Sequence, residues 1–357
     1  MFETVYISIY FLLGLFVRIG LKKQFKKINK SNELICLEDI TVIIPFRNEV
    51  KNLPKFIRSL NQQSKYPVTF LFINDHSTDR GEELIKALKH DFLLLELPEN
   101  SNGKKEAIRF AVKSVKTNYV LTLDADIELN DDYFYSLEKL SKSDFFVLPV
   151  VMKGTGLTKR FYELDFALSN AMNVSVSGLI RPFIASGANL LFNKTKFLQF
   201  DSYQDHKMIA SGDDVFLLND FRKNNCSIEV VSDLCFSVST DAPNTFHEFI
   251  SQRLRWIGKG KKVGDRLSNG LAFVAAFIHI VFVLVFIFQI EQQRWFELFV
   301  FVVLKIALEL IVYYPYFKKI NRLKTWIILP LSTFVYPIYI LVLLVLLPLY
   351  RPKWKNR

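Results

Sequence analysis

The chain has 357 residues, half of them apolar and 15% aromatic, and a formal net charge of +11. This length fits one large domain or two medium ones. Many basic residues flank apolar segments, as in the cluster Lys22–Lys30, so juxtamembrane charge explains the balance and we expect no nucleic-acid partner. The three cysteines form no CxxC pair, which excludes a disulfide framework and a cysteine zinc site.

Residues 1–21 are predicted to form an N-terminal transmembrane helix. Its apolar stretch, Thr4–Val17, is short for a full span, and Arg18 can extend it by snorkelling to the interface. A signal peptide would carry its positive charge before the apolar run, whereas here the charge follows. The positive-inside rule then places the N-terminus outside and the basic juxtamembrane linker, residues 22–39, in the cytoplasm.

Residues 40–245 are predicted to form a cytoplasmic α/β catalytic domain. Short apolar runs rich in β-branched and aromatic residues alternate there with amphipathic helical patterns. The expected strands are Thr41–Ile44, Thr69–Ile73, Phe92–Leu95, Tyr119–Leu123 and Phe145–Val150. One helix is expected to carry Leu53, Phe56, Ile57 and Leu60 on its buried face, and another to start at Asp79. This alternation predicts a mostly parallel sheet with helices on both faces.

Polar residues follow three of the expected strands. They are Arg47, Asn48 and Glu49, then Asn74, Asp75 and His76, and finally Asp124 and Asp126. Ligands of such sheets bind at the carboxyl ends of the strands, so we expect these side chains to meet there. Two carboxylates one residue apart on a strand can point at one spot, and a hard cation such as Mg²⁺ or Mn²⁺ would relieve their repulsion.

Two later segments carry further candidates. Gly212-Asp213-Asp214 precedes a helical pattern, so its aspartates fit either a helix N-cap or a general base. Residues 246–268 are predicted to form an interfacial helix in which Gln252, Arg255 and Trp256 share one face. Arginine there could bind a diphosphate, and tryptophan could stack on a sugar or an apolar tail. Both residue types also suit the headgroup level of a bilayer.

Residues 269–350 are predicted to form C-terminal transmembrane helices. Leu271–Ile290 is one span, and Phe296–Phe317 is a second, in which Lys305 and Glu309 are four apart and could pair. A third apolar segment, Trp326–Tyr350, is interrupted by prolines. A full third span would place the basic tail 351–357 outside, against the positive-inside rule, so this segment is either broken or re-entrant or the tail is an exception.

Taken in order, these clusters resemble the family 2 glycosyltransferases with a GT-A fold. They are most similar to the membrane-embedded branch that includes cellulose, hyaluronan and poly-N-acetylglucosamine synthases and ceramide glucosyltransferase. The resemblance covers residues 40–260. It rests on VIIPFRNE at 42–49, INDHSTD at 73–79, NGK at 102–104, DADI at 124–127, SGANLLFNK at 186–194, GDD at 212–214 and QxxRW at 252–256. His76 stands where that family usually has glycine, and we expect it to reshape the pocket floor.

The resemblance implies a role for each matching position. Asp124 and Asp126 would hold Mg²⁺ or Mn²⁺, and Asp214 would be the catalytic base. Donor binding would fall to Pro45, Arg47, Glu49, Asp75, Lys104 and Arg255. Acceptor binding would fall to Gly187, Asn189, Asp213, Gln252 and Trp256.

These roles predict an inverting, metal-dependent glycosyltransferase with several membrane spans. It would move a sugar from a nucleotide-diphosphate donor, by resemblance UDP-linked, to a lipid-linked or membrane-proximal acceptor. One alternative is a processive polysaccharide synthase, which the QxxRW pattern also fits. A second alternative is a non-catalytic regulator that binds nucleotide sugars. Partner subunits or a homo-oligomer are compatible with all three.

Overall fold

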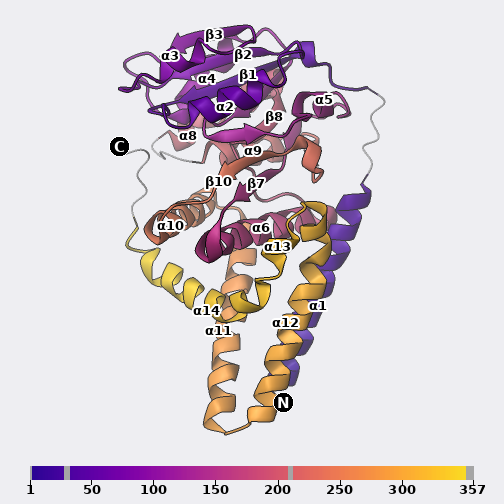
Figure 1. The fold of residues 1–357 in the computed structure, drawn as a ribbon. Helices are drawn as coiled ribbons and strands as arrows, with labels where there is room; N and C mark the ends of the chain where they lie inside the picture. The colour runs from indigo at the N-terminus through magenta and orange to yellow at the C-terminus, as the bar shows by residue number, and fades with distance from the viewer. Residues whose placement is uncertain (1, 28–32, 208–211, 351–357) are drawn as a thin grey trace. The chain divides into compact units, whose positions relative to one another are not determined.

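The computed structural model describes residues 2–27, 33–207 and 212–350 of the protein (Figure 1). The chain divides into two units, each built from separate stretches. The sheet unit takes its described residues from 33–153 and 184–241, and the helical unit takes its own from 2–27, 154–183 and 242–350. The predicted catalytic domain, 40–245, is therefore interrupted, because residues 154–183 belong to the helical unit.

The sheet unit is built around a seven-stranded sheet with the order β3-β2-β1-β4-β8-β6-β9. The bounds are β1 Ile40–Phe46, β2 Thr69–Asn74, β3 Phe92–Glu96, β4 Tyr119–Leu123, β6 Phe145–Val147, β8 Asn189–Asn193 and β9 Ile228–Val230. Strand β1 pairs in parallel with both β2 and β4, and only β8 runs antiparallel to its neighbours. The predicted mostly parallel sheet is confirmed. Because the strand order turns back beside β1, the crevice for a ligand is expected at the carboxyl ends of β1 and β4.

The last predicted strand, Phe145–Val150, is wrong as a single element. The chain forms β6 in the large sheet and then β7, Val150–Lys153, in a second sheet with the order β5-β10-β7. Here β5 is Ile127–Leu129 and β10 is Val238–Asp241. Pro149 lies between β6 and β7, and it has no N–H to continue a ladder. Because the residues of β6 and β7 form one continuous apolar run, the sequence did not indicate this change of sheet.

Seven α-helices connect the described strands of the sheet unit. They are α2 Leu53–Asn61, α3 Gly81–Ile85, α4 Lys104–Ser114, α5 Tyr133–Leu137, α7 Lys194–Phe200, α8 Tyr203–His206 and α9 Asp213–Lys223, with 3-10 turns η1 Leu37–Asp39 and η2 Leu234–Phe236. Helix α2 buries Leu53, Phe56, Ile57 and Leu60, as its spacing predicted. Helix α3 begins two residues after the predicted Asp79, whose Oδ1 accepts a hydrogen bond from the Gly81 N–H at 3.1 Å.

The helical unit contains the apolar ends of the chain. Its helices are α1 Phe2–Lys26, α6 Gly156–Leu179, α10 Phe246–Val263, α11 Arg266–Glu291, α12 Trp295–Lys319, α13 Leu323–Trp326 and α14 Leu329–Leu346. Three of them, α1, α11 and α14, are long and apolar enough to cross a membrane. Helix α12, which was also predicted to span, carries Lys305 and Glu309 in its middle and is not among these three.

Close backbone contact joins α1 to α6. A Cβ atom added to Gly20 would lie 2.2 Å from the Ser175 carbonyl oxygen, and one added to Gly178 would lie 2.2 Å from the Gly20 carbonyl oxygen. Only glycine allows two helix backbones to approach so closely. Helix α1 also packs against α12, where Gly14 faces Val312. Helix α6 lies within the residue range predicted for the catalytic domain, but these contacts make it part of the helical unit.

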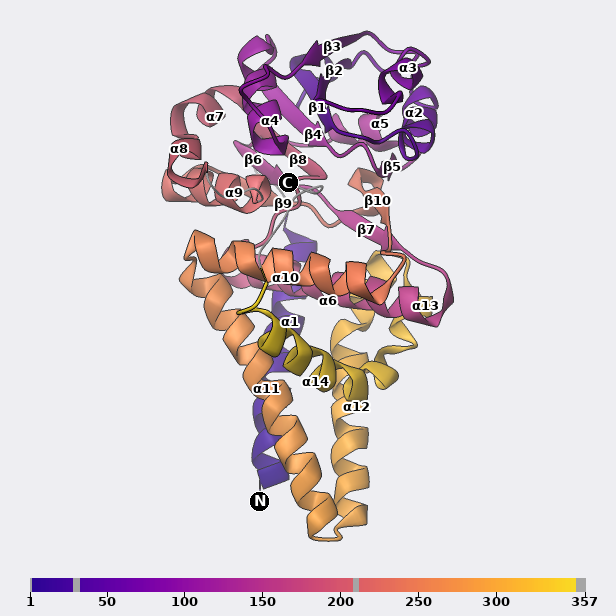
Figure 2. The ribbon, with the colours of Figure 1, turned by 90° about the vertical axis from the view of Figure 1, so that its left-hand side faces the viewer.

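Most of the last apolar segment, Trp326–Tyr350, forms one continuous helix, α14, which is among the three that could cross a membrane, so both of its predicted forms stay predictions. The chain leaves α13 at Trp326 and enters α14 at Leu329, with Pro330 in the first turn of α14 and Pro337 inside it. Figure 2 shows α14 crossing α11 and α12 obliquely, while α11 and α12 form a hairpin beside α1. The basic tail, 351–357, lies outside the described residues.

Candidate functional site

The loops after β1 and β2 are joined by side chain–backbone hydrogen bonds. The Asn48 Oδ1 atom accepts from the Thr78 N–H at 2.7 Å, and the Asn48 N–H donates to Ser77 Oγ at 3.1 Å. The Val50 N–H donates to Asp79 Oδ2 at 2.9 Å. Two polar clusters that are separate in the sequence therefore form one edge of the sheet, as the strand-end argument predicted.

Asp75 is the most buried carboxylate of this edge, at 1% exposure. Its Oδ2 accepts from the Gly103 N–H at 3.1 Å and lies 3.9 Å from Arg47 Nη1, which also donates to the Asp75 carbonyl oxygen at 3.3 Å. Its Oδ1 is buried and has no hydrogen-bond partner among the described residues. Such an atom is costly to leave unpaired, so it is suited to a donor group supplied by a ligand.

His76 adopts a left-handed backbone conformation, with φ of 54°. The glycine that the resemblance implies at this position adopts such a conformation freely, whereas a larger side chain there carries strain. The His76 Nε2 atom lies 3.0 Å from the Ser101 carbonyl oxygen, within hydrogen-bond distance. The imidazole therefore ties the β2 loop to the segment that leads into α4.

A second chain of contacts links Asp124 to Asp214 through Lys104 and Gly187. The Lys104 ammonium, at the start of α4, lies 2.6 Å from Asp124 Oδ1 and donates to the Gly187 carbonyl oxygen at 3.1 Å. The Gly187 N–H in turn donates to Asp214 Oδ2 at 3.3 Å. The Lys104 side chain and the backbone of one residue, Gly187, thus link the predicted metal-binding segment to the predicted base.

The two metal-binding candidates lie in a turn. Strand β4 ends at Leu123 and β5 begins at Ile127, so strand alternation does not set the directions of Asp124 and Asp126. Asp126 is exposed and the Asp124 side chain is 33% exposed, so both are accessible. Their carboxylate oxygens are the ligands that Mg²⁺ and Mn²⁺ prefer, and the Lys104 ammonium shows that Asp124 already attracts a cation. The donor set fits a hard divalent ion.

Asp214 lies in the first turn of α9, two residues after a left-handed glycine. Gly212 has φ of 98°, which turns the chain into the helix. The Asp214 Oδ1 atom accepts from the N–H of Val215 at 2.8 Å. The neighbouring Asp213 starts the same helix, but its side chain lies outside the described residues, so its predicted acceptor role stays a prediction.

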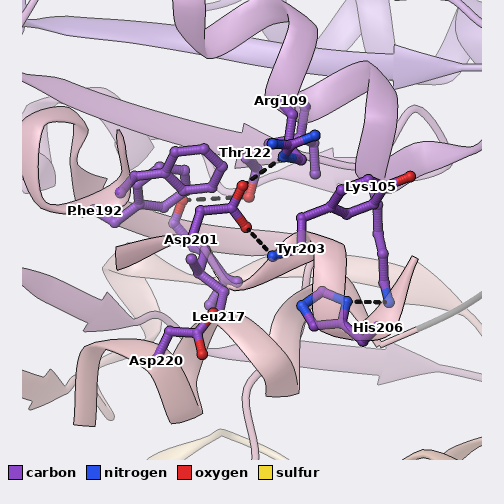
Figure 3. A pocket seen from close by; sticks show the side chains of 12 residues that line it. Lys105, Arg109, Thr122, Phe192, Asp201, Tyr203, His206, Leu217 and Asp220 are labelled. Atoms are coloured by element: carbon purple, nitrogen blue, oxygen red, sulfur yellow. Dashed lines mark hydrogen bonds and ion pairs between the residues drawn. The ribbon is translucent and has the colours of Figure 1, made fainter. Parts of the chain in front are cut away.

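A small, mostly apolar cavity of about 30 Å³ is lined by residues of α4, β4, β8, α7, α8 and α9 (Figure 3). Its walls include Asp201, His206 and Asp220, whose ligand atoms lie within 4.8 Å of one another. Three such groups could hold a metal by spacing alone. This volume is enough to hold a water molecule, which needs about 10–15 Å³ of cavity volume.

Two cations argue against a metal in this cavity. Arg109 Nε lies 2.5 Å from Asp201 Oδ2, and Lys105 Nζ lies 3.1 Å from His206 Nδ1 (Figure 3). Burial, with Lys105 as a second cause, lowers the pKa of His206 to about 4, so the imidazole is neutral near pH 7. We interpret this cluster as polar packing that ties α4 to the segment before α9. Nothing in the local sequence around these residues indicated it.

The remaining sheet-unit predictions have different outcomes. Asn189 is fully buried, and its amide is used by Tyr133, Pro149 and Phe236 at 2.5–3.0 Å. This environment does not fit an acceptor contact, so we assign Asn189 a structural role. Pro45 is buried near the end of β1, and the Glu49 carboxylate accepts from Asn52 Nδ2 at 2.6 Å.

The QxxRW residues lie on α10, in the helical unit. Gln252, Arg255 and Trp256 are all half-buried there. The arginine between them, Arg253, was missed: it is buried and forms an ion pair with Asp165 of α6. One residue corresponds to about 100° around an α-helix, so Arg253 lies beside the face shared by Gln252 and Trp256, and nothing in the sequence indicated that it would be buried.

Part of the chain matches a known protein family. The family model described as Glycosyl transferase family 2 matches residues 41–199. The chain contains a glycosyl transferase family 2 domain. The matched range includes β1 through β4, Asp75, Lys104 and both aspartates of the DAD turn. Asp214 and the QxxRW helix lie beyond it.

The family 2 domain has curated relatives in staphylococci. The chain is 31% identical over 199 residues to 4,4'-diaponeurosporenoate glycosyltransferase of Staphylococcus haemolyticus, covering 53% of this chain and 52% of that one. It is 25% identical over 278 residues to poly-beta-1,6-N-acetyl-D-glucosamine synthase of Staphylococcus aureus, covering 74% of this chain and 65% of that one. The chain thus spans between about half and two thirds of the length of these relatives.

A solved structure supports the fold of the family 2 domain. Mannosyltransferase PcManGT from Pyrobaculum calidifontis, in complex with GDP-Man and Mn²⁺, aligns with a TM-score of 0.60 at 14% identity. The alignment covers 94% of this chain and 99% of that one. The predicted GT-A fold, a mostly parallel sheet with apolar helices elsewhere in the chain, is confirmed.

Proposed function

We propose that this protein is an inverting, metal-dependent glycosyltransferase that transfers a sugar from a nucleotide-diphosphate donor to an acceptor at a membrane. The observation that carries the proposal is the contact chain Asp124–Lys104–Gly187–Asp214. It links a cation-attracting carboxylate, through the Lys104 side chain and the Gly187 backbone, to a carboxylate suited to be a base. A diphosphate leaving group and an attacking hydroxyl need these two functions side by side.

Donor recognition is assigned to the edge formed by the β1 and β2 loops. Asp75 Oδ1, buried and without a partner among the described residues, would accept a hydrogen bond from the nucleotide base. The imide N–H of uracil is such a donor, in line with the UDP-linked donor that the resemblance implied. Arg47 helps to hold Asp75 in place, because its guanidinium donates to the Asp75 carbonyl oxygen. Pro45 and Glu49 remain proposed donor contacts by position.

Divalent metal binding is assigned to Asp124 and Asp126, and the ion would be Mg²⁺ or Mn²⁺. When bound, such an ion neutralises charge on the departing diphosphate. The Lys104 ammonium lies next to Asp124 and adds positive charge there. The solved mannosyltransferase of the same fold contains Mn²⁺, which supports the choice of ion.

Proton removal is assigned to Asp214. Its Oδ2 atom accepts a long hydrogen bond of 3.3 Å from the Gly187 N–H, and that oxygen can take a proton from an acceptor hydroxyl. The deprotonated oxygen would attack the anomeric carbon from the side opposite the diphosphate, so one displacement inverts that centre. Gly187 would contribute to acceptor binding through the same loop. The roles of Arg255, Gln252 and Trp256 stay predictions.

The acceptor is proposed to be a lipid-linked or other membrane-proximal hydroxyl group. Three helices of the chain could cross a membrane, which suits an acceptor confined to a bilayer. The two curated relatives differ here, since one is named for 4,4'-diaponeurosporenoate and the other for a β-1,6-linked polymer. Processive polymer synthesis therefore remains the second candidate, supported by the longer alignment with the synthase.

Product analysis in membranes tests the proposal. Vesicles containing the protein would be supplied with labelled UDP-glucose or UDP-N-acetylglucosamine and Mn²⁺, and the label would be followed into lipid extract and polymer. We expect one sugar per acceptor in the lipid fraction. A ladder of products would contradict single transfer and support the processive alternative. Donor binding without any release of nucleotide diphosphate would favour the non-catalytic regulator.

A further inference from the structure

Arg253 is the buried cation of the QxxRW helix. It is 4% exposed, and its guanidinium forms an ion pair with Asp165 of α6, which is 5% exposed. Its Nη2 also donates to the Tyr162 carbonyl oxygen at 3.4 Å. A buried arginine held on two sides has little freedom to change its orientation, because its planar fork fixes several hydrogen bonds at once.

The same guanidinium contacts two predicted acceptor-binding residues. Its Nη1 donates to Gln252 Oε1 at 2.6 Å. Its central carbon lies 4.4 Å from the centre of the Trp256 ring, a cation–π contact. The orientation of Gln252 and Trp256 therefore depends on where Arg253 is held.

Helix α14 holds the far side of this ion pair. The Tyr336 hydroxyl donates to Asp165 Oδ1 at 2.7 Å, while Arg253 uses the other oxygen, Oδ2. Each carboxylate oxygen thus has its own partner. Removing one partner from a buried pair leaves a charge without compensation, which is far more disruptive than losing an exposed contact.

Helix α14 also contacts a second buried ion pair, through Thr333, which lies three residues before Tyr336. Thr333 Oγ1 donates to Glu309 Oε2 of α12 at 2.9 Å. The other oxygen of Glu309 lies 2.5 Å from Lys305 Nζ and accepts from the Tyr10 hydroxyl of α1 at 2.5 Å. This confirms the Lys305–Glu309 pairing predicted from the sequence. Thr333 and Tyr336 lie on one side of α14, so this helix links the two ion pairs.

We propose that Tyr336 and Asp165 are positioning residues for the acceptor-binding face of α10. They hold Arg253, and Arg253 orients Gln252 and Trp256, so an apolar helix that crosses α11 and α12 sets the geometry in which the acceptor is presented. The inference rests on the proposed function, and in particular on acceptor binding by Gln252 and Trp256. It assigns no role in donor binding to these groups.

Tyr336→Phe tests the proposal, because it removes one hydroxyl and keeps the ring. The matched control is Tyr314→Phe on α12, where the tyrosine is 39% exposed. In membranes supplied with labelled UDP-sugar, we expect the share of cleaved sugar recovered in the lipid or polymer fraction to fall about tenfold for Tyr336→Phe. The KM for the nucleotide sugar should stay at the wild-type value. The control should match wild type in both.

Trp256 fluorescence provides a readout that does not need activity. The emission of Trp256 is isolated by subtracting the spectrum of the matching Trp256→Phe protein. We expect Tyr336→Phe to change the emission maximum and the acrylamide quenching of Trp256, and Tyr314→Phe to change neither. Should Tyr336→Phe not fold, Arg253→Lys keeps the charge opposite Asp165 but loses the fork to Gln252, and the same two changes are expected.

The outcomes separate this inference from the proposed function. Unchanged Trp256 emission together with an unchanged share of transferred sugar in a folded variant overturns the positioning role alone. A rise of the donor KM as large as the fall in transferred sugar would also contradict the positioning role, since that result indicates general disruption of the protein. Wild-type membranes that cleave no donor overturn the proposed function, while Trp256 emission still decides whether Tyr336 positions α10.

Discussion

Two carboxylates of the candidate site in the sheet unit, Asp75 and Asp214, accept hydrogen bonds from backbone N–H groups, whereas the helical unit holds its polar residues with buried ion pairs. Asp75 is fixed by the Gly103 N–H, and Asp214 by the N–H groups of Gly187 and Val215. In the helical unit, Arg253 pairs with Asp165 and Lys305 pairs with Glu309.

This difference follows from what each unit provides. Loops at the carboxyl ends of parallel strands present free N–H groups, and these can bind anions and carboxylates. Long helices use their own N–H groups internally, so a polar side chain between them needs another side chain as partner. We therefore expect single substitutions in the sheet unit to change chemistry, and those in the helical unit to change packing and orientation.

The largest expected effect comes from Asp214→Asn. The amide keeps the shape of the side chain but cannot accept the proton, so turnover should fall about a thousandfold while nucleotide-sugar binding persists. Turnover and donor affinity would be measured on the same preparation, with the exposed Asp131→Asn as control. Near-normal turnover in Asp214→Asn would make the base assignment wrong.

Asp126→Asn should reduce turnover about a hundredfold. An amide oxygen is a weaker ligand for a hard cation than a carboxylate, so saturation should also need a higher Mn²⁺ concentration. The measurement is turnover against Mn²⁺ concentration, and Asp131→Asn serves again as control. A drop in rate with no shift of the Mn²⁺ dependence would assign Asp126 a role other than metal binding.

Gly178→Ala should destabilise the helical unit by about 2 kcal/mol, because the new methyl group would overlap the Gly20 carbonyl oxygen. The matched control is Gly270→Ala in α11, where an added Cβ meets no atom within 4 Å. That control should be neutral or slightly stabilising, since alanine is the better helix former. Thermal unfolding in detergent measures both. Equal midpoints for the two variants would contradict the close approach of α1 and α6.

The smallest expected effect is the pH dependence due to His206. Its pKa is lowered to about 4 in the folded protein by burial and by Lys105, whereas an unfolded histidine titrates near about 6.5. Between these values the unfolded chain binds a proton that the folded one does not, so stability falls as the pH drops through this window. The slope is at most about 1.4 kcal/mol per pH unit.

Thermal midpoints at pH 7 and pH 5 measure this dependence. His206→Gln should lose less stability between the two pH values than wild type, and the exposed His247→Gln should behave like wild type. A pH response in His206→Gln as steep as that of wild type would show that His206 is not buried as a neutral group.

The sequence predicted most of the sheet unit because its signals are local. Apolar runs end in polar clusters at the strand ends, and a parallel sheet brings these ends together. Two errors also have local causes. Pro149 divides one apolar run between two sheets, and Asn189, read as a site residue, is a buried amide satisfied by its neighbours.

The partners in the helical unit could not be predicted in the same way. Asp165 and Arg253 are 88 residues apart, and Tyr336 is 171 residues from Asp165. Helical spacing showed that Lys305 and Glu309 could meet because they are on one helix. Helical spacing does not predict which residues of two different helices meet. The sequence analysis therefore singled out the neighbours of Arg253 and not Arg253 itself.

Release of nucleotide diphosphate by the wild-type protein in membranes tests the central claim most directly. A panel of nucleotide sugars would be supplied with Mg²⁺, with Mn²⁺ or with a chelator. We predict release from at least one UDP-sugar with a divalent ion and none with the chelator. Release that is equally fast without any metal, or no release from any donor, would contradict the account.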